Sequence, residues 1–263
     1  MVVMSQQNQL VSPVTKFVLS FELALKSLIF SRKWFLYIIL GCVPLFFTLI
    51  GGDYLLGEAT VKGAFLNMFM TFHFGFFFVF GTLMLMLPVS SDEIQDNVID
   101  LFLIRPIRRE VLYVARWLAL VLANIVVNFF IVIIYYVFYH IADGANPLSN
   151  IDVLMQAFLF LIPASLIYSG LFLLVGFMGR RGFSMGVFIA ILELFFLSLL
   201  FLNDDPIIPR TNLKVIASEL FGGAYNYSAQ GIPDLTEALL YVIGVSVGLV
   251  VAGCLYFRQQ QFD

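Results

Sequence analysis

Charged residues are scarce in this sequence. Asp, Glu, Lys and Arg together make up only 12% of the chain, while hydrophobic residues make up 61%. A water-soluble domain carries roughly twice that share of charge, so this composition excludes an ordinary soluble fold. Cys42 and Cys254 are the two cysteines, and both lie inside apolar runs. Their spacing fits neither a metal site nor a disulfide framework, so we expect no metal ligands here.

Nucleotide-binding and zinc-protease motifs are also missing. The sequence has no GxxxxGK[ST] phosphate loop and no HExxH, and no polar region is large enough for a nucleotide-binding domain. Ser165 and Ser169 have no His partner in register, which argues against a membrane-embedded hydrolase. We therefore expect no catalytic residue and no ATPase site in this chain.

The dominant feature is a set of six apolar runs. Each is close to or longer than the about 18 residues that cross about 30 Å of hydrocarbon. The runs are continuous rather than alternating, which favours helices over a β-barrel. We predict an all-α polytopic membrane protein, with residues 1–263 forming one transmembrane domain and spans at 34–50, 65–87, 117–139, 153–177, 183–202 and 235–257.

Basic residues are distributed unevenly between the loops. If the N-terminus is cytoplasmic, eleven Lys and Arg residues lie on the cytoplasmic side, and only Lys62, Arg210 and Lys214 lie outside. This asymmetry follows the positive-inside rule. It predicts a multi-pass protein of the cell membrane with both termini in the cytoplasm.

Two segments outside the spans also show helical patterns. Ser12-Pro13 is typical of a helix start, and Glu22 and Lys26 form an i,i+4 pair in the turns that follow. We predict an amphipathic elbow helix over 12–32 on the cytoplasmic surface. We predict that segment 203–234 forms one or two short extracellular helices, one of which ends at Gly222.

The densest group of charges lies between the second and third predicted spans. Residues 90–116 hold nine of the 31 charged residues. Ser90 and Glu93 have capping-box spacing, and Pro106 ends the helix that they begin. We predict an amphipathic helix over 90–105 with an acidic polar face, whereas a helix lying on anionic lipid would carry Lys and Arg there. An ordinary cytoplasmic loop with a short interfacial helix is the alternative.

This stretch resembles the permease subunits of type-2 ABC exporters. That family carries an acidic helix, then Pro-Ile-Ser-Arg, then Gly-Lys, between spans two and three. The matching residues here are Glu93, Asp100-Leu101-Phe102-Leu103, Pro106-Ile107-Arg108-Arg109 and Ala115-Arg116. Arg108 stands where the family has Ser, and Ala115-Arg116 stands where it has Gly-Lys. In the family this element is a coupling helix that inserts into a groove of a separate ATPase subunit.

The resemblance implies an exporter built from two six-span chains, identical or similar, each docked on a cytoplasmic ATPase. ATP and Mg²⁺ would be bound by that partner, and this chain would hold no cofactor of its own. It would contact membrane lipid and no nucleic acid. The residues expected to contact the ATPase are Glu93, Asp96, Asp100, Arg105, Pro106, Arg108 and Arg109.

Two other functions fit the same residues. One is a non-transporting membrane scaffold or sensor that binds a cytoplasmic partner through the 90–105 segment. The other is a secondary transporter driven by ions through Glu193. The substrate stays open among lipid, drug, peptide and glycan.

Several polar residues lie within the predicted spans. Glu193 is near the middle of the fifth, where a charged residue costs roughly 2.5–3.5 kcal/mol on insertion scales. Its carboxyl is either a contact or gate on the substrate path, or a neutral group hydrogen-bonded to a neighbouring span. Asn124 and Asn128, one turn apart in the third span, are further candidates for the path, although such residues more often bridge helices. His73 is predicted to be buried and hydrogen-bonded.

Overall fold

The described part of the chain is helical except for short connections between the helices. A computed structural model describes residues 12–51, 61–90, 107–142, 144, 146–178, 181–196, 208–222 and 233–259. No β-strand occurs within these ranges. The predicted all-α fold is therefore confirmed for the residues that the structure describes.

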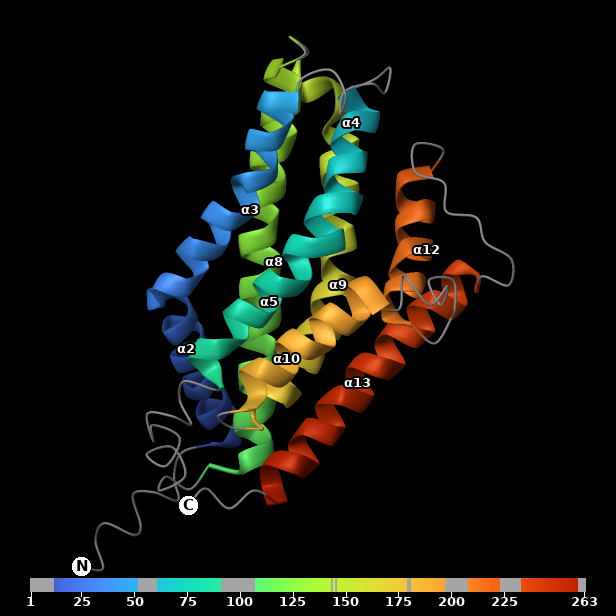
Figure 1. The fold of residues 1–263 in the computed structure, drawn as a ribbon. Helices are drawn as coiled ribbons and strands as arrows, with labels where there is room; N and C mark the ends of the chain where they lie inside the picture. The colour runs from blue at the N-terminus through green and yellow to red at the C-terminus, as the bar shows by residue number, and fades with distance from the viewer. Residues whose placement is uncertain are drawn as a thin grey trace, which may run out of the picture.

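The helices form one elongated bundle around α8, which runs from one end to the other (Figure 1). The α-helices are α2 (Pro13–Phe30), α3 (Arg32–Gly51), α4 (Val61–Asn67), α5 (Phe78–Met86), α8 (Arg109–Ala142), α9 (Ile151–Gly176), α10 (Gly182–Ile191), α12 (Pro209–Phe221) and α13 (Leu235–Gln259). The others are the π-helices η1 (Met68–Phe77) and η5 (Leu192–Phe196) and the 3₁₀-helices η2 (Leu87–Val89) and η3 (Pro147–Asn150).

Several of these helices are long and apolar enough to cross a membrane. Among the described residues there are four such runs: Val61–Val89, Arg109–Ala142, Pro147–Gly176 and Leu235–Gln259. A fifth arises if α2 and α3, which meet at a 55° bend, are taken as one broken span. Gly182–Leu194 is apolar but shorter. These helices indicate a membrane-embedded protein with four or five spans in its described part, fewer than the six predicted.

The N-terminal helix begins where the sequence predicts. The Ser12 side chain accepts a hydrogen bond from the Thr15 backbone N–H at 3.2 Å, and Pro13 occupies the first turn. The predicted Glu22–Lys26 ion pair is formed at 2.7 Å. Instead of standing apart, α2 packs along α8. Its position relative to a membrane surface stays a prediction.

Aromatic side chains fill the centre of the bundle where η1, α9 and α12 meet. Phe69 and Phe74 of η1 lie 5.6 Å and 4.9 Å from Phe160 of α9, measured between ring centroids. Phe221 of α12 lies 5.9 Å from Phe69. Such edge-to-face pairs add to the free energy gained from packing. Part of the Phe-rich second span is therefore core, while Phe76 remains 40% exposed.

The helix α12 lies within the segment predicted as an extracellular helical loop. It ends at Gly222, whose φ of 57° favours glycine, in agreement with the predicted stop. Leu213, Ile216 and Ala217 are buried against the bundle. In Figure 1, α12 stands beside α9 and touches α13. The side of the membrane on which it lies stays a prediction.

The approach of α3 to α5 depends on Gly81. The ring of Tyr37, which is 1% exposed, occupies the space where a Cβ at residue 81 would be, with Tyr37 Cζ only 1.9 Å from that position. Small residues at helix contacts allow this approach, and a larger side chain would force the two helices apart. Packing of α3 on the bundle therefore requires glycine at this position.

We predict that Gly81→Val destabilises the protein by about 1–3 kcal/mol, the usual effect of overpacking. Gly244→Val is the matched control, because a Cβ at residue 244 has no atom within 4 Å. Its effect should stay within about 0.5 kcal/mol. The measurement is thermal unfolding of the detergent-purified protein, and equal melting temperatures for the two variants would contradict this packing.

Candidate functional site

The predicted coupling segment lies mostly outside the described residues. The predicted ATPase contacts that fall there are Glu93, Asp96, Asp100, Arg105 and Pro106. The described residues at its edges are Ser90, which follows η2, and Ile107 and Arg108, which precede α8. The segment therefore connects two apolar helices of membrane length. Ser90 directly follows the first of them, and Ile107 and Arg108 lead into the second.

The first edge of this segment is held firmly in the bundle. Ser90 is fully buried, and its hydroxyl donates to the Met86 carbonyl at 2.8 Å. Gly176 of α9 packs against it, because a Cβ at residue 176 would lie 2.4 Å from Ser90 Oγ. The Ser27 hydroxyl of α2 also donates to the Pro88 carbonyl at 3.1 Å. Contacts from α2 and α9 thus fix the point where the segment begins.

The second edge is held by the end of α13. The Arg109 Nη1 group donates to the Arg258 carbonyl at 3.3 Å, and Arg258 Nε lies 3.8 Å from Glu110 Oε1. Arg108 is exposed next to them. Both predicted contact arginines within the described residues therefore lie beside Arg258, which was not among the predicted site residues.

Asn124 and Asn128 form a hydrogen-bonded centre inside the bundle. Both are fully buried. The Asn128 amide nitrogen donates to the Asn124 carbonyl and side-chain oxygens, at 2.7 Å each. Asn128 accepts from the Tyr37 hydroxyl, and the Asn124 amide donates to Ser165 Oγ at 3.3 Å. Thr82 Oγ1 lies 3.1 Å from Asn124 Oδ1. The two amides connect α3, α5, α8 and α9, which is the bridging role that the sequence left open beside a role on the substrate path.

His73 lies beside this centre and is fully buried. It packs among the rings of Phe69, Phe78 and Tyr135 at centroid distances of 5.7, 6.4 and 5.5 Å. Neither ring nitrogen makes a hydrogen bond in the described part of the chain. The predicted burial is confirmed; Asn128 is a polar neighbour of the imidazole, but the two side chains do not reach hydrogen-bond geometry.

Glu193 belongs to a second polar cluster. It is 6% exposed in the π-helix η5, and its Oε1 accepts a hydrogen bond from the Tyr168 hydroxyl of α9 at 2.5 Å. Arg210 of α12 lies within electrostatic range of both groups. The Arg210 guanidinium also packs on Gly75 of η1, with Nη2 3.2 Å from the position of a Cβ there. The structure therefore brings Glu193 to a neighbouring helix, and it adds Tyr168 and Arg210 to the candidate residues.

π-Helical turns often mark functional sites, and both π-helices of the described chain border this second cluster. Sequence reasoning missed Tyr168 because nothing in the pattern of α9 sets it opposite Glu193. Arg210 was assigned to the outer side because it lies in the polar stretch between the fifth and sixth predicted spans. The one signal that could have prompted a search for Tyr168 and Arg210 is that the buried carboxyl of Glu193 has no partner within its own span.

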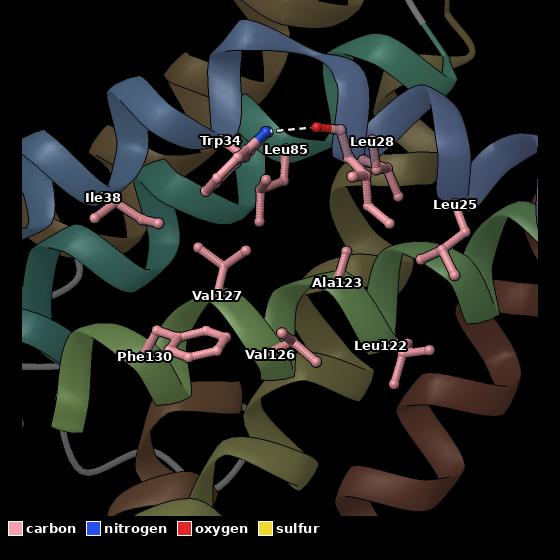
Figure 2. Close-up of a pocket in the computed structure, with 11 residues that line it drawn as sticks. Leu25, Leu28, Trp34, Ile38, Leu85, Leu122, Ala123, Val126, Val127 and Phe130 are labelled. Atoms are coloured by element: carbon pink, nitrogen blue, oxygen red, sulfur yellow. Dashed lines mark hydrogen bonds between the residues drawn. The ribbon is translucent and has the colours of Figure 1, made fainter.

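An apolar groove opens at the bend between α2 and α3. Its volume is about 290 Å³, and α2, α3, α5 and α8 all contribute to it. Figure 2 shows Trp34, Leu85 and Ala123 facing this space, with Val127 and Phe130 farther along α8. The indole Nε1 of Trp34 donates to the Ile29 carbonyl at 2.6 Å across the bend. All the side chains lining the groove are apolar, so it suits hydrocarbon rather than a charged ligand.

A Gly-x-Ser-x-Gly pattern also occurs, at Gly182–Gly186. In a nucleophile elbow the serine stands on a sharp turn between a strand and a helix. Ser184 instead lies in the first turn of α10 and is exposed. His73 and His140 are both buried elsewhere, in η1 and α8. The pattern therefore lacks the structural context of a nucleophile.

Comparison of the chain with protein-family models, with curated proteins and with solved structures finds no match.

We predict that Tyr37 and Asn128 are energetically coupled. In a double-mutant cycle of Tyr37→Phe and Asn128→Ala, the interaction should be about 0.6 kcal/mol and no more than about 1.7 kcal/mol, the range for hydrogen bonds between membrane helices. The measurement is the free energy of unfolding in detergent micelles. Tyr136→Phe with Asn128→Ala is the matched control and should be additive, because the Tyr136 hydroxyl donates to Pro147 instead. Additivity in both cycles would contradict the hydrogen-bonded centre.

Proposed function

We propose that this chain is the transmembrane permease subunit of a type-2 ABC exporter. Two copies, or a pair of similar chains, would form the pathway across the cell membrane, each with six spans and cytoplasmic termini. The six spans would be those predicted from the sequence: four correspond to the long apolar runs, and the other two are 34–50, which follows the elbow helix, and 183–202, which begins within the apolar helix at Gly182–Leu194. ATP and Mg²⁺ would bind to a separate cytoplasmic ATPase subunit.

The observation that carries the proposal is the stretch 90–109. Its acidic helix pattern, Pro106-Ile107 and following arginines resemble the coupling element of that family. It connects two candidate spans, Val61–Val89 and Arg109–Ala142. The described residues at its edges are anchored by contacts with α2, α9 and α13.

These anchors support a mechanical role for the segment. α8 has 34 residues and is about 51 Å long at 1.5 Å per residue, so it is a rigid lever. A short helix fixed at both ends transmits displacement to such a lever, whereas a long flexible loop would absorb it. Closure of two ATPase subunits around nucleotide would move both coupling helices and tilt the bundle between inward and outward access.

We predict that reversing Asp96 and Asp100 to Lys abolishes coupling to the ATPase. The double variant should co-purify with the ABC ATPase encoded nearest to this gene at least about tenfold less well, as expected when charges at an interface repel. The chain should still insert into the membrane. The measurement is co-purification together with ATP hydrolysis by the complex.

Asp152→Lys with Glu237→Lys is the matched control for this charge reversal. These residues lie at the first turns of α9 and α13, and the first turn of α13 is at the opposite end of that helix from Arg258. The control should bind the ATPase as the wild type does. Unchanged hydrolysis in the Asp96 and Asp100 variant would remove the coupling assignment, and binding without stimulated hydrolysis would point to a scaffold or sensor.

An ion-driven secondary transporter is the second candidate function. It is favoured by one observation, the burial of Glu193 with Tyr168 as hydrogen-bond partner and Arg210 in range. Intramembrane carboxyl groups serve in proton relays of transporters. The two candidates differ in their energy source.

Under the exporter proposal, proteoliposomes of this chain alone should show no proton flux above that of empty liposomes, measured with a trapped pH-sensitive dye. Glu193→Gln should then change nothing, because no proton passes through the carboxyl. Flux that is present in the wild type, is retained in Tyr168→Phe and is lost in Glu193→Gln would favour the ion-driven function.

A further inference from the structure

A basic pocket lies where the first turn of α8 meets the last turn of α13. Its volume is about 530 Å³, and it is lined by Arg108, Arg109, Glu110, Val111 and Arg258. Three guanidinium groups and one carboxylate therefore share one concave surface. Arginine side chains are well suited to phosphate, because their planar N–H groups pair with its oxygens.

The two helices that carry the pocket approach each other closely next to it. A Cβ at Gly253 of α13 would lie 2.0 Å from Tyr113 Cζ of α8, so only glycine allows this contact. The rings of Phe177 and Phe257 lie beside this contact, 4.6 Å apart between centroids and tilted by 52°. The Cys254 thiol also lies 3.9 Å from the Glu110 carbonyl oxygen. The arginines are thus carried on a fixed joint between two helices.

The charges within the pocket are only weakly neutralised by each other. Arg258 Nε and Glu110 Oε1 are 3.8 Å apart, and the Arg258 side chain is 71% exposed, so this ion pair contributes little. Arg109 donates to the Arg258 carbonyl and so satisfies a backbone acceptor in the last turn of α13. The N-terminus of α8 adds the positive end of its helix dipole.

The position of the pocket points to lipid. Arg109 and Arg258 lie at the ends of two candidate spans, where an apolar helix leaves the hydrocarbon and meets the headgroups. Figure 1 shows these two helix ends together at one end of the bundle. Leu255 and Val251 share the Arg258 face of α13 at helical spacing, and each is more than half exposed. A stripe of exposed apolar surface therefore leads to the basic pocket.

We propose that this pocket binds the phosphate group of an anionic phospholipid, whose acyl chain lies along the exposed face of α13. Arg108 and Arg258 contact the phosphate, and Glu110 limits the affinity by repulsion. The site is formed by this chain alone, so its test needs no ATPase, although Arg108 and Arg109 are also expected ATPase contacts under the proposed function.

The test uses the purified full-length chain in detergent, with thermal unfolding followed as short-chain lipid is added. The probes are dioctanoyl phosphatidylglycerol, dioctanoyl phosphatidylcholine and inorganic phosphate. A ligand that binds the folded state raises the melting temperature in a saturable way. We expect phosphatidylglycerol to do so at lower concentration than phosphatidylcholine, and phosphate alone to have no comparable effect.

Single variants make the test specific. Arg258→Gln should raise the half-saturating concentration of phosphatidylglycerol about fivefold, and Arg108→Gln with Arg258→Gln should raise it further. Glu110→Gln should lower that concentration, a change that loss of folding cannot mimic. Arg181→Ala is the matched control: it removes an exposed arginine that is not part of the pocket and should change nothing.

Three outcomes would overturn the proposal. The first is equal stabilisation by the two lipids, and the second is a phosphatidylglycerol response that is unchanged in the double arginine variant. The third is saturation by inorganic phosphate with the same dependence on arginine, which would indicate a site for free anions. If phosphatidylglycerol has no effect and Arg258→Gln prevents binding of the ATPase, the pocket instead receives an acidic protein surface.

Discussion

The hydrogen bonds of Asn124 and Asn128 are the interaction on which the rest of the bundle depends. Lipid does not compete for these amides in the hydrocarbon region, and each must find its partners within the protein. Because both project from the middle of α8, their partners come from three other helices. A rotation or slide of any of those helices would leave a buried polar group without a partner. The centre therefore fixes the register of α3, α5 and α9 on α8.

Close packing at glycine residues, in addition to the hydrogen bonds of the two amides, holds the helices together. Without a hydrophobic driving force between helices in lipid, association rests on van der Waals contact and interhelical hydrogen bonds. The side chain of Tyr37 packs on Gly81, that of Ser90 packs on Gly176 and that of Tyr113 packs on Gly253. Two of these three contacts lie next to the edges of the 90–109 segment. The contacts of Ser90 and Tyr113 thus join the helices close to both described edges of the 90–109 segment.

Much of the fold could be predicted from the sequence, because hydropathy and helix capping are local properties. The four long spans, the Ser12-Pro13 start and the Gly222 stop all follow from neighbouring residues. The break between α2 and α3 lies where the predicted elbow helix ends, but its 55° angle and the two π-helices could not be predicted, since each depends on packing against distant helices.

The candidate site was only partly predictable for the same reason. The acidic stretch and the polar residues within spans stood out by composition. The pairing of Tyr168 with Glu193, and the meeting of Arg258 with Arg108 and Arg109, join residues far apart in the chain. A sequence pattern carries no record of such contacts, so the basic pocket became visible only once the ends of α8 and α13 were brought together.

The π-helix η1 has a further consequence for how this chain tolerates changes in length. Phe69 and Phe74 are five residues apart, and both reach Phe160, which the i→i+5 geometry of a π-helix allows. A π-helical turn holds about one residue more than an α-helical turn, so loss of one residue from η1 would convert a wide turn into an α-helical turn and leave the faces of α4 and α5 in place. A homologue one residue shorter here would therefore keep the orientation of α4, and an alignment gap in this segment would indicate a lost wide turn rather than a trimmed loop.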